Sequence, residues 1–390
     1  MDQQRIDYRR SRQLLSITII FFWASEYCHA PYFTPYLQQL GFMPEVIGFI
    51  TGAYGFTQMW VRVPLGMVTD ATGGYRRTIL MGTVFTTVSS FGLIFAETLV
   101  PILICRVLAG IAASTWLAFT VLYNAYYKAE ESVQAMTNVN AFNNAGKLLA
   151  FAIGMVTSSI WGYKVPLWGS FITGCIAICF AARLKPIQLR RERFRFSVAL
   201  QTLKNPAVLA AAAFAIVLQF FMQGTVFSFT SAAAKEIGAT PFWIGAATVL
   251  YTLVQVAGAK VIGGRLLKRL SAWQAVTLGC GLMAVSAVLV AFGVHIALIC
   301  LGQLVAGVAN LILSAVLMSM VVRHTPQERQ STAMGLYQAI YGLGMSAGPV
   351  LVGQWVAAGG YRGAYLIVAA LMATAMLAAP LVIRRADRDH

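Results

Sequence analysis

The sequence predicts an all-α membrane protein with twelve transmembrane helices, arranged as two homologous six-helix bundles with both termini in the cytoplasm. Hydrophobic residues make up 58% of the chain and charged residues only 11%, whereas about a quarter of an ordinary soluble domain is charged. Long apolar runs recur along the whole chain, and the second half repeats motifs of the first. The expected surrounding of the protein is therefore a lipid bilayer.

Each apolar run is about as long as the 20 residues that a helix needs to cross a bilayer. The first run is followed by eleven more and has no small-residue cleavage site, so we interpret it as an uncleaved span. Strands are excluded because the runs are long and do not alternate. The predicted spans are 14–38, 45–68, 78–97, 100–123, 134–159, 164–183, 206–230, 242–263, 274–293, 296–321, 332–357 and 363–383.

The net charge of +16 follows the positive-inside rule. With both termini inside, the cytoplasmic segments hold 22 of the 29 Lys and Arg residues, and the outer loops hold three. The charge thus sets topology, and no nucleic-acid partner is expected. A basic stretch, "RLKPIQLRRERFRF", joins the halves. The predicted domains are an N-terminal bundle over 1–183, a cytoplasmic linker over 184–205 and a C-terminal bundle over 206–390.

The two halves match in order and at near-constant spacing, which indicates an internal duplication. Two six-helix halves related along the membrane normal are a transporter architecture, with the substrate near the midplane. The matching pairs are "GFMPEVIG" at 41–48 and "GATPFWIG" at 238–245, "RVLAG" at 106–110 and "QLVAG" at 303–307, "AMTNVNAFNNAG" at 135–146 and "AMGLYQAIYGLG" at 333–344, and "GYK" at 162–164 and "GYR" at 360–362.

Two motifs resemble the major facilitator superfamily. "GMVTDATGGYRR" at 66–77 resembles its signature loop, although Ala71 replaces a basic residue and two positions are extra. "RVLAG" resembles its fourth-helix motif, common in proton-coupled members. The proline of the fifth-helix antiporter motif is missing, but the mirror helix contains "GMSAGPVLVG" at 344–353. The chain is thus similar to twelve-helix drug:proton antiporter-like exporters.

This resemblance implies a conformational latch in the loop between the second and third spans. Asp70 would act through its charge on the facing half and on Arg76 or Arg77, and would favour the outward-open state. Gly66 completes the matched positions of the loop. The alternative interpretation is a simple turn that carries basic topology residues.

Charged residues deep within spans are candidates for function, because each costs at least a few kcal/mol at the bilayer centre. Glu26 is the only deep carboxylate, so we interpret it as a proton carrier that pairs with Arg106 or Lys147 when deprotonated. Arg62 lies nearer the cytosol. The repeat aligns Glu26, Arg106, Lys147 and Arg62 with neutral residues of the second half, in that order Gln223, Gln303, Met345 and Ala259.

A polar stripe on the fifth span provides candidates for substrate binding. Asn140, Asn143 and Lys147 share one face by their spacing, and Gln338 and Tyr341 occupy the mirror face in span eleven. Hydrogen bonding between helices is the alternative role for the amides. The remaining predicted substrate-binding residues are Trp23, Tyr27, Arg62, Gln223 and Gln303.

Together these features predict a proton-coupled secondary active transporter that works by alternating access. The resemblance to drug exporters and the Asp70 loop imply efflux by an antiporter, and the mainly positive deep charges favour an anionic or zwitterionic amphipathic small molecule as its substrate. We expect a monomer in the plasma membrane, or in the inner membrane if the source is bacterial. A proton-coupled importer of a small organic anion or metabolite is the alternative. A membrane enzyme or sensor is disfavoured because no nucleophile elbow, phosphate loop or His-rich cluster is found, and no metal or other cofactor is expected.

Overall fold

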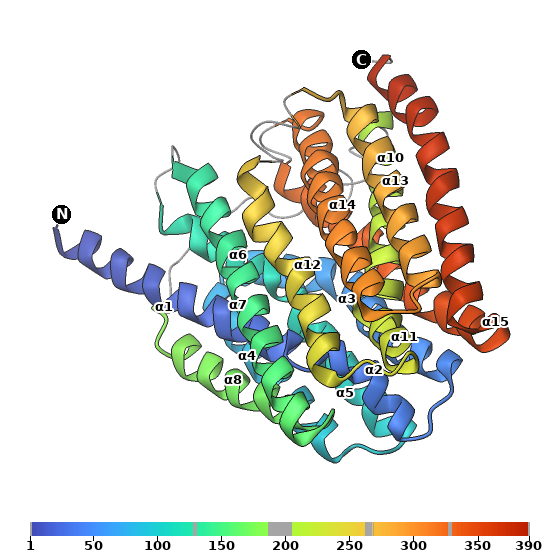
Figure 1. The fold of residues 1–390 in the computed structure, drawn as a ribbon. Coiled ribbons are helices and arrows are strands. Elements are labelled where there is room, and N and C mark those ends of the chain that lie inside the picture. The colour runs from blue at the N-terminus through green and yellow to red at the C-terminus, as the bar shows by residue number, and fades with distance from the viewer. Residues whose placement is uncertain are drawn as a thin grey trace. The chain divides into compact units, whose positions relative to one another are not determined.

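A computed structural model describes residues 2–127, 131–185, 205–261, 267, 269–326 and 330–388. All regular elements in these ranges are helices (Figure 1). Residues 186–204 of the predicted linker lie outside them. The elements are α1 (Asp2–Tyr27), α2 (Ala30–Gln39), α3 (Pro44–Thr72), α4 (Tyr75–Phe95), α5 (Leu99–Ser114), α6 (Trp116–Ala125), α7 (Ser132–Trp161), α8 (Val165–Ala181), α10 (Pro206–Phe221), the π-helix η2 (Met222–Phe229), α11 (Thr230–Glu236), α12 (Pro241–Val261), α13 (Ala272–Ala291), α14 (Ile296–Arg323) and α15 (Gln330–Arg388).

Several predicted spans consist of more than one helix. The first contains α1 and α2, the fourth contains α5 and α6, and the seventh contains α10, η2 and α11. The last two spans are joined in α15, whose backbone is not helical at Gly359 and Gly360. In the described part of the chain, seven helical stretches are long and apolar enough to cross a membrane. The helical fold class is confirmed, and the number of spans stays a prediction.

The chain divides into two compact units. Unit 1 contains Met1–Ala30 and Trp60–Phe194, and unit 2 contains Pro31–Met59 and Arg195–His390. Pro31–Met59 thus belongs to unit 2, although the sequence places it in the N-terminal bundle. The reason is close packing of α3 on α15 within unit 2. A Cβ atom added at Gly52 would lie 2.7 Å from the carbonyl oxygen of Ser346, and small residues permit such a close approach of two backbones.

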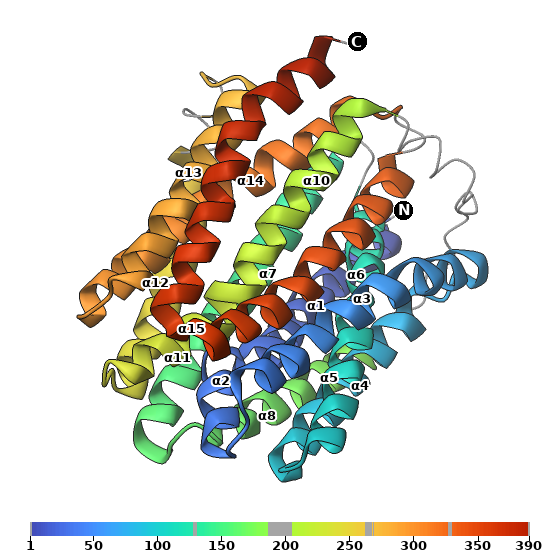
Figure 2. The ribbon, with the colours of Figure 1, turned by 90° about the vertical axis from the view of Figure 1, so that its right-hand side faces the viewer.

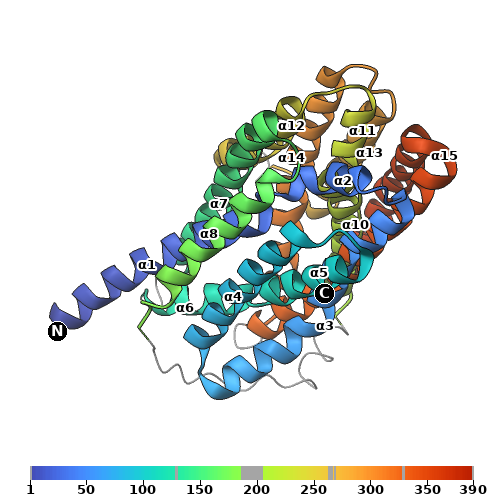
Figure 3. The same ribbon diagram turned by 90° about the horizontal axis from the view of Figure 1, so that it is seen from below.

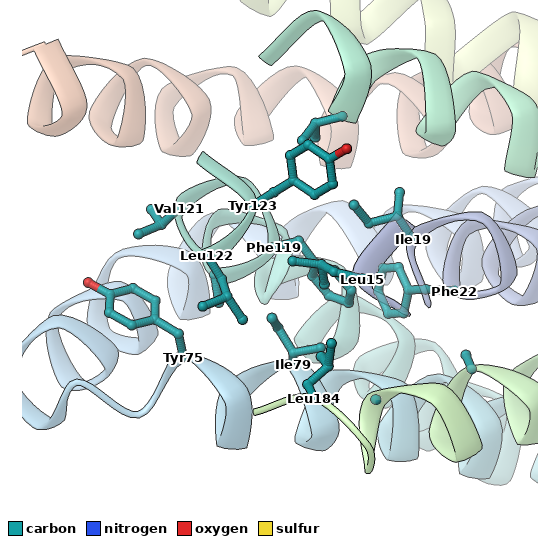
Figure 4. Close-up of a cluster of buried hydrophobic side chains, with 14 of the residues drawn as sticks. Leu15, Ile19, Phe22, Tyr75, Ile79, Phe119, Val121, Leu122, Tyr123 and Leu184 are labelled. Carbon is teal, nitrogen blue, oxygen red and sulfur yellow. The ribbon is translucent and has the colours of Figure 1, made fainter. Parts of the chain in front are cut away.

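Unit 1 is built around a buried cluster of aromatic and aliphatic side chains from α1, α4, α6, α7 and the end of α8 (Figure 4). Phe22 and Phe119 lie at its centre, with ring centroids 4.8 Å apart, and both are fully buried. The helices α7 and α8 both pack against α1, and α8 runs along it (Figure 3). This packing fixes the face of α1 that carries Trp23 and Tyr27.

In unit 2, α13 packs against α14 and α15, and α10 lies beside the first part of α15 (Figure 2).

Two helices of unit 2 begin at residues whose side chains bond to the backbone of the first turn. The Asn205 side chain caps α10 by accepting a hydrogen bond from the backbone N–H of Ala207 at 2.9 Å, and Pro206 occupies the first helical position. The Gln274 side chain accepts a hydrogen bond from the backbone N–H of Ser271 at the start of α13.

Two pairs of repeated glycines have the same backbone conformation in both halves. Gly41 and Gly238 have φ angles of 85° and 80°, and Gly162 and Gly360 have φ angles of 88° and 67°. Side chains with a Cβ atom disfavour this left-handed region, whereas glycine adopts it at little cost. The repeated glycines of the sequence therefore mark equivalent bends of the chain.

Gly344→Ala is expected to destabilise the protein, because its new Cβ atom would collide with the backbone oxygen of Ile216 on α10. The expected cost is about 1–3 kcal/mol, as for other overpacked interiors. Gly335→Ala on the same helix is the matched control, because its Cβ would meet no atom within 4 Å. Thermal unfolding of the purified variants measures the difference, and equal midpoints for the two would contradict the close packing of α10 on α15.

Candidate functional site

The first span of each half is interrupted at equivalent positions. In the first half, α1 ends at Tyr27 and α2 begins at Ala30. In the second half, the π-helix Met222–Phe229 occupies the seventh span, and the repeat offset of 197 aligns it with residues 25–32. Interrupted helices expose backbone groups that a regular helix satisfies internally, and they are a frequent feature of transporter binding sites.

In unit 1, the ammonium group of Lys147 lies over two aromatic rings of α1. Its Nζ atom is 5.3 Å from the ring centroid of Trp23 and 4.9 Å from that of Tyr27. The next residues outward are also aromatic, with Trp116 5.1 Å from Trp23 and Phe151 6.0 Å from Tyr27 between ring centroids. These contacts bring together three of the predicted substrate-binding residues.

No carboxylate neutralises Lys147 within the described ranges. Lys147 has no hydrogen bond or ion pair to a described residue, in contrast to Lys164, which pairs with Glu97 at 3.3 Å. Its charge is attracted by the ring faces, an interaction of about 0.5–2 kcal/mol per ring. Beside it, the Nε1 atom of Trp23 is buried and has no hydrogen-bond acceptor among the described residues. The site thus offers a cation and an N–H donor with no protein anion opposite them.

Glu26 lies about one turn after Trp23 and directly before Tyr27 in sequence, and it is only 7% exposed. Just beyond it, His29 occupies the interruption between α1 and α2. Its Nδ1 atom is 2.9 Å from Ser170 Oγ, and the charge of Arg106 acts on its ring. The predicted proton-coupling residue Glu26 is thus buried three residues from His29, and the half-buried Arg106 acts on the same histidine.

The other polar candidates of unit 1 lie in different settings. Arg62 is buried and donates a long hydrogen bond of 3.5 Å to the carbonyl oxygen of Ala113. On α7, Asn143 is half-buried and Asn140 is exposed. The described contacts do not bring either asparagine to the rings that hold Lys147.

In the signature loop, the hydrogen-bond partner of Asp70 is Tyr75, whereas the resemblance implies Arg76 or Arg77. The Oδ1 atom of Asp70 accepts a hydrogen bond of 2.7 Å from the hydroxyl group of Tyr75. The guanidinium of Arg76 instead donates to the carbonyl oxygen of Ala182 at 2.8 Å, at the end of α8, where a helix C-terminus attracts cations. Arg77 is exposed, and a Cβ atom added at Gly66 would lie 3.2 Å from the Leu117 side chain. A link from Asp70 to either arginine is thus replaced by one to Tyr75.

The predicted residues of unit 2 carry amide and phenol groups. Gln303 is buried on α14, and Gln223 is half-buried within η2. Gln338 and Tyr341 are half-buried on α15, where the Tyr341 ring is 5.5 Å from that of Tyr337.

Sequence reasoning missed several polar partners in the interior. Ser170 holds His29, Tyr75 holds Asp70, and Asn310 donates to the Tyr251 hydroxyl at 3.0 Å. The sequence could have indicated Asn310 as a polar interior residue, because it lies two turns after Gln303 on the same face of one span. For Ser170 and Tyr75 no comparable pattern exists in the sequence.

Comparison with known proteins matches the description Major Facilitator Superfamily to residues 15–233 and 210–390. An uncharacterized MFS-type transporter of Methanocaldococcus jannaschii is 22% identical over 343 residues, which are 83% of this chain and 85% of that protein. A second, from Mycobacterium tuberculosis, is 24% identical over 358 residues, 85% of this chain and 82% of the relative.

A solved structure of the nucleoside transporter NupG has a similar fold. Its TM-score is 0.78 at 14% sequence identity, and the match covers 96% of this chain and 98% of NupG. At this identity the similarity shows the fold and not the substrate.

Proposed function

Because this chain belongs to the major facilitator superfamily of membrane transporters, we propose that it is a proton-coupled secondary active transporter of an anionic or zwitterionic amphipathic small molecule. It is a multi-pass membrane transporter and not an enzyme. The substrate, the coupling to protons and the direction of transport are the parts that we propose. The proposed direction of transport is export from the cytoplasm. The proposed active form is a monomer in the plasma membrane.

The unneutralised charge of Lys147 carries the proposal. Lys147 is half-buried, and a cation withdrawn from water without an anion beside it is unfavourable in a medium of low dielectric constant. A carboxylate or phosphate of the substrate would compensate the charge of Lys147, and the buried Nε1–H of Trp23 would donate a hydrogen bond to it. A cationic substrate at the same place would meet like charge.

The surrounding rings support an amphipathic substrate. Trp23, Tyr27, Trp116 and Phe151 form a continuous set of aromatic contacts around Lys147. Binding sites for small molecules combine such apolar walls with a few polar anchors. An aromatic or aliphatic body attached to the anionic group matches this arrangement.

Glu26 is the proposed proton carrier. It is the only carboxylate deep in a predicted span, it is buried, and it lies beside the interruption of the first span. Protonation removes its charge and so changes the electrostatic balance among Glu26, Arg106 and Lys147. Uptake of a proton is thereby linked to binding or release of the anion.

Lys147→Met is expected to weaken carboxylate binding about 10- to 100-fold, because a hydrogen bond to a charged group contributes about 1.5–3 kcal/mol. The probes are 4-phenylbutyrate and its cationic counterpart 4-phenylbutylamine, with binding measured by thermal shift and calorimetry on the purified protein. Lys164→Met is the control, because Lys164 is exposed and already paired with Glu97.

Wild-type protein and the Lys164→Met variant should both prefer the carboxylate. Tight binding of the amine, absence of carboxylate binding, or an unchanged affinity in Lys147→Met would each contradict an anionic substrate.

Glu26→Gln should abolish substrate flux driven by a pH gradient while the protein remains folded, because the amide cannot exchange a proton. Glu97→Gln provides the control at an exposed carboxylate. Transport into proteoliposomes with an imposed pH gradient measures the effect, and oriented vesicles reveal its direction. Undiminished gradient-driven flux in Glu26→Gln would remove this residue from coupling, and flux that follows protons in the same direction would identify an importer.

We also propose that Asp70 acts as a latch with Tyr75 as its positioning residue. Asp70→Asn should shift the resting population toward the inward-open state, and Tyr75→Phe should shift it the same way by a smaller amount. Spin-label distances in a background without the six native cysteines would report the populations. Unchanged distance distributions in both variants would leave the loop as a simple turn.

A further inference from the structure

Two cysteines lie on adjacent turns of α8, on the side that points away from the core of unit 1. Cys175 is half-buried and Cys179 is exposed, and their spacing of four residues places both on one side of the helix. Trp168 and Ile172 continue this side toward the start of α8, and both are exposed. Because these neighbours are large and apolar, we expect this side, which we call the outer face of α8, to meet lipid.

The opposite side of α8 makes the packing contacts with α1 and α4. Ser170, Gly174 and Ala177 are buried there. A Cβ atom added at Gly174 would collide with the Thr87 side chain and would lie 2.9 Å from Ser25 Oγ. Because the two thiols are on the other side, a group bound to them leaves this packing intact.

The pair differs from the remaining cysteines, which are far apart in the sequence, namely Cys28, Cys105, Cys280 and Cys300. Cys175 and Cys179 are both free thiols, and they interact electrostatically. The Cβ atoms of residues at this spacing are about 5–6 Å apart in a helix, and the one torsion of each side chain can direct its sulfur toward the neighbouring turn. A single atom that binds two sulfurs can therefore bridge the pair.

The surroundings restrict which atom fits such a bridge. Among the described residues, no three His, Cys, Asp or Glu side chains lie together as a metal-binding group, so zinc would lack the four ligands of a closed site. Thiolates prefer soft centres, and an apolar surrounding disfavours a charged product. A trivalent arsenic atom that carries one organic group meets both conditions, because two sulfur atoms complete its three bonds and the product is neutral.

We propose that Cys175 and Cys179 form a dithiol site for trivalent arsenicals that carry one organic group. Two S–H and two As–O bonds break, two As–S bonds form, and two water molecules leave the hydrated arsenical. Arsenic stays trivalent, so neither an oxidant nor a reductant is needed. The pair lies near the end of α8 that the sequence predicts to be cytoplasmic, and a reducing cytoplasm keeps thiols free. This site goes beyond the proposed transport function and does not involve its substrate.

The test measures how firmly the full-length protein holds phenylarsine oxide. The labelled protein is incubated with glutathione, and mass spectrometry of the intact chain counts the phenylarsenic groups that remain. In a bridge, the second thiol is an intramolecular ligand at an effective concentration of millimolar order, so glutathione at about 0.1 mM should release the bridged group about tenfold more slowly than a group held by one thiol. The dithiol 2,3-dimercaptopropanol should release it quickly, because it offers both sulfur ligands at once.

Wild-type protein should retain one phenylarsenic group, whereas Cys175→Ser and Cys179→Ser should each retain none. Cys300→Ser keeps the pair and should behave as the wild type. The matched spacing control combines Cys175→Ser with Ile172→Cys. It leaves two thiols on the same face, but seven residues and thus about 10.5 Å apart, and it should retain none.

Retention in either single variant or in the spacing control would overturn the proposal, as would rapid loss from the wild-type protein. Cys175→Ala and Cys179→Ala repeat the test if a serine variant has a lowered midpoint of thermal unfolding. A zinc ion that protects both thiols from N-ethylmaleimide more strongly than phenylarsine oxide does would contradict the ligand class. Lys147→Met should retain the group, so the result does not depend on the proposed substrate.

Discussion

The packing of unit 1 places a half-buried ammonium group, that of Lys147, against the aromatic rings of α1. The neighbouring Gly146 brings α7 so close to α1 that an added Cβ would collide with the backbone oxygen of Ile20. Because of this approach, the lysine side chain begins against α1 and its ammonium reaches the rings of Trp23 and Tyr27. The Trp23 ring contacts those of Trp116 and Phe22, and Phe22 contacts Phe119 in turn. The interaction with two ring faces offsets part of the desolvation cost of the ammonium, and an anion would offset more.

The two halves share repeated motifs, but the side chains at the aligned positions differ in charge. Glu26, Arg106 and Lys147 are all in unit 1, and the positions that the repeat aligns with them in unit 2 are Gln223, Gln303 and Met345. Titratable groups can change charge with a proton, whereas amides and thioethers cannot at any physiological pH. Under the proposed proton coupling, the titratable groups of one half could therefore change without disturbing the uncharged hydrogen-bonding groups of the other half.

The sequence predicts the helical class and the location of the helices well, because length and apolarity alone determine what crosses a bilayer. It groups Lys147 with Trp23 and Tyr27 among the expected substrate-binding residues, but it does not predict that the ammonium lies over their rings, because it offers Glu26 as the partner of that lysine. The partners of Asp70 and His29 were not predictable. Tyr75 and Ser170 are ordinary in composition, and only the packing of α4 and α8 brings them to their partners. The membership of Pro31–Met59 in unit 2 has a similar origin, because the spacing of glycines on α3 does not tell which helix they meet.

The π-helix has a geometric consequence for the whole seventh span. Each residue added to a helical turn rotates everything after it by about 100° relative to an uninterrupted α-helix. A helical wheel drawn through residues 206–236 therefore assigns the residues of α11 to the wrong side. Thr230 begins α11, and its hydroxyl lies 2.7 Å from that of Tyr365 on α15. The wider turn of η2 thus rotates α11 about the helix axis relative to α10. The two helices can therefore turn different faces of the same span toward their neighbours.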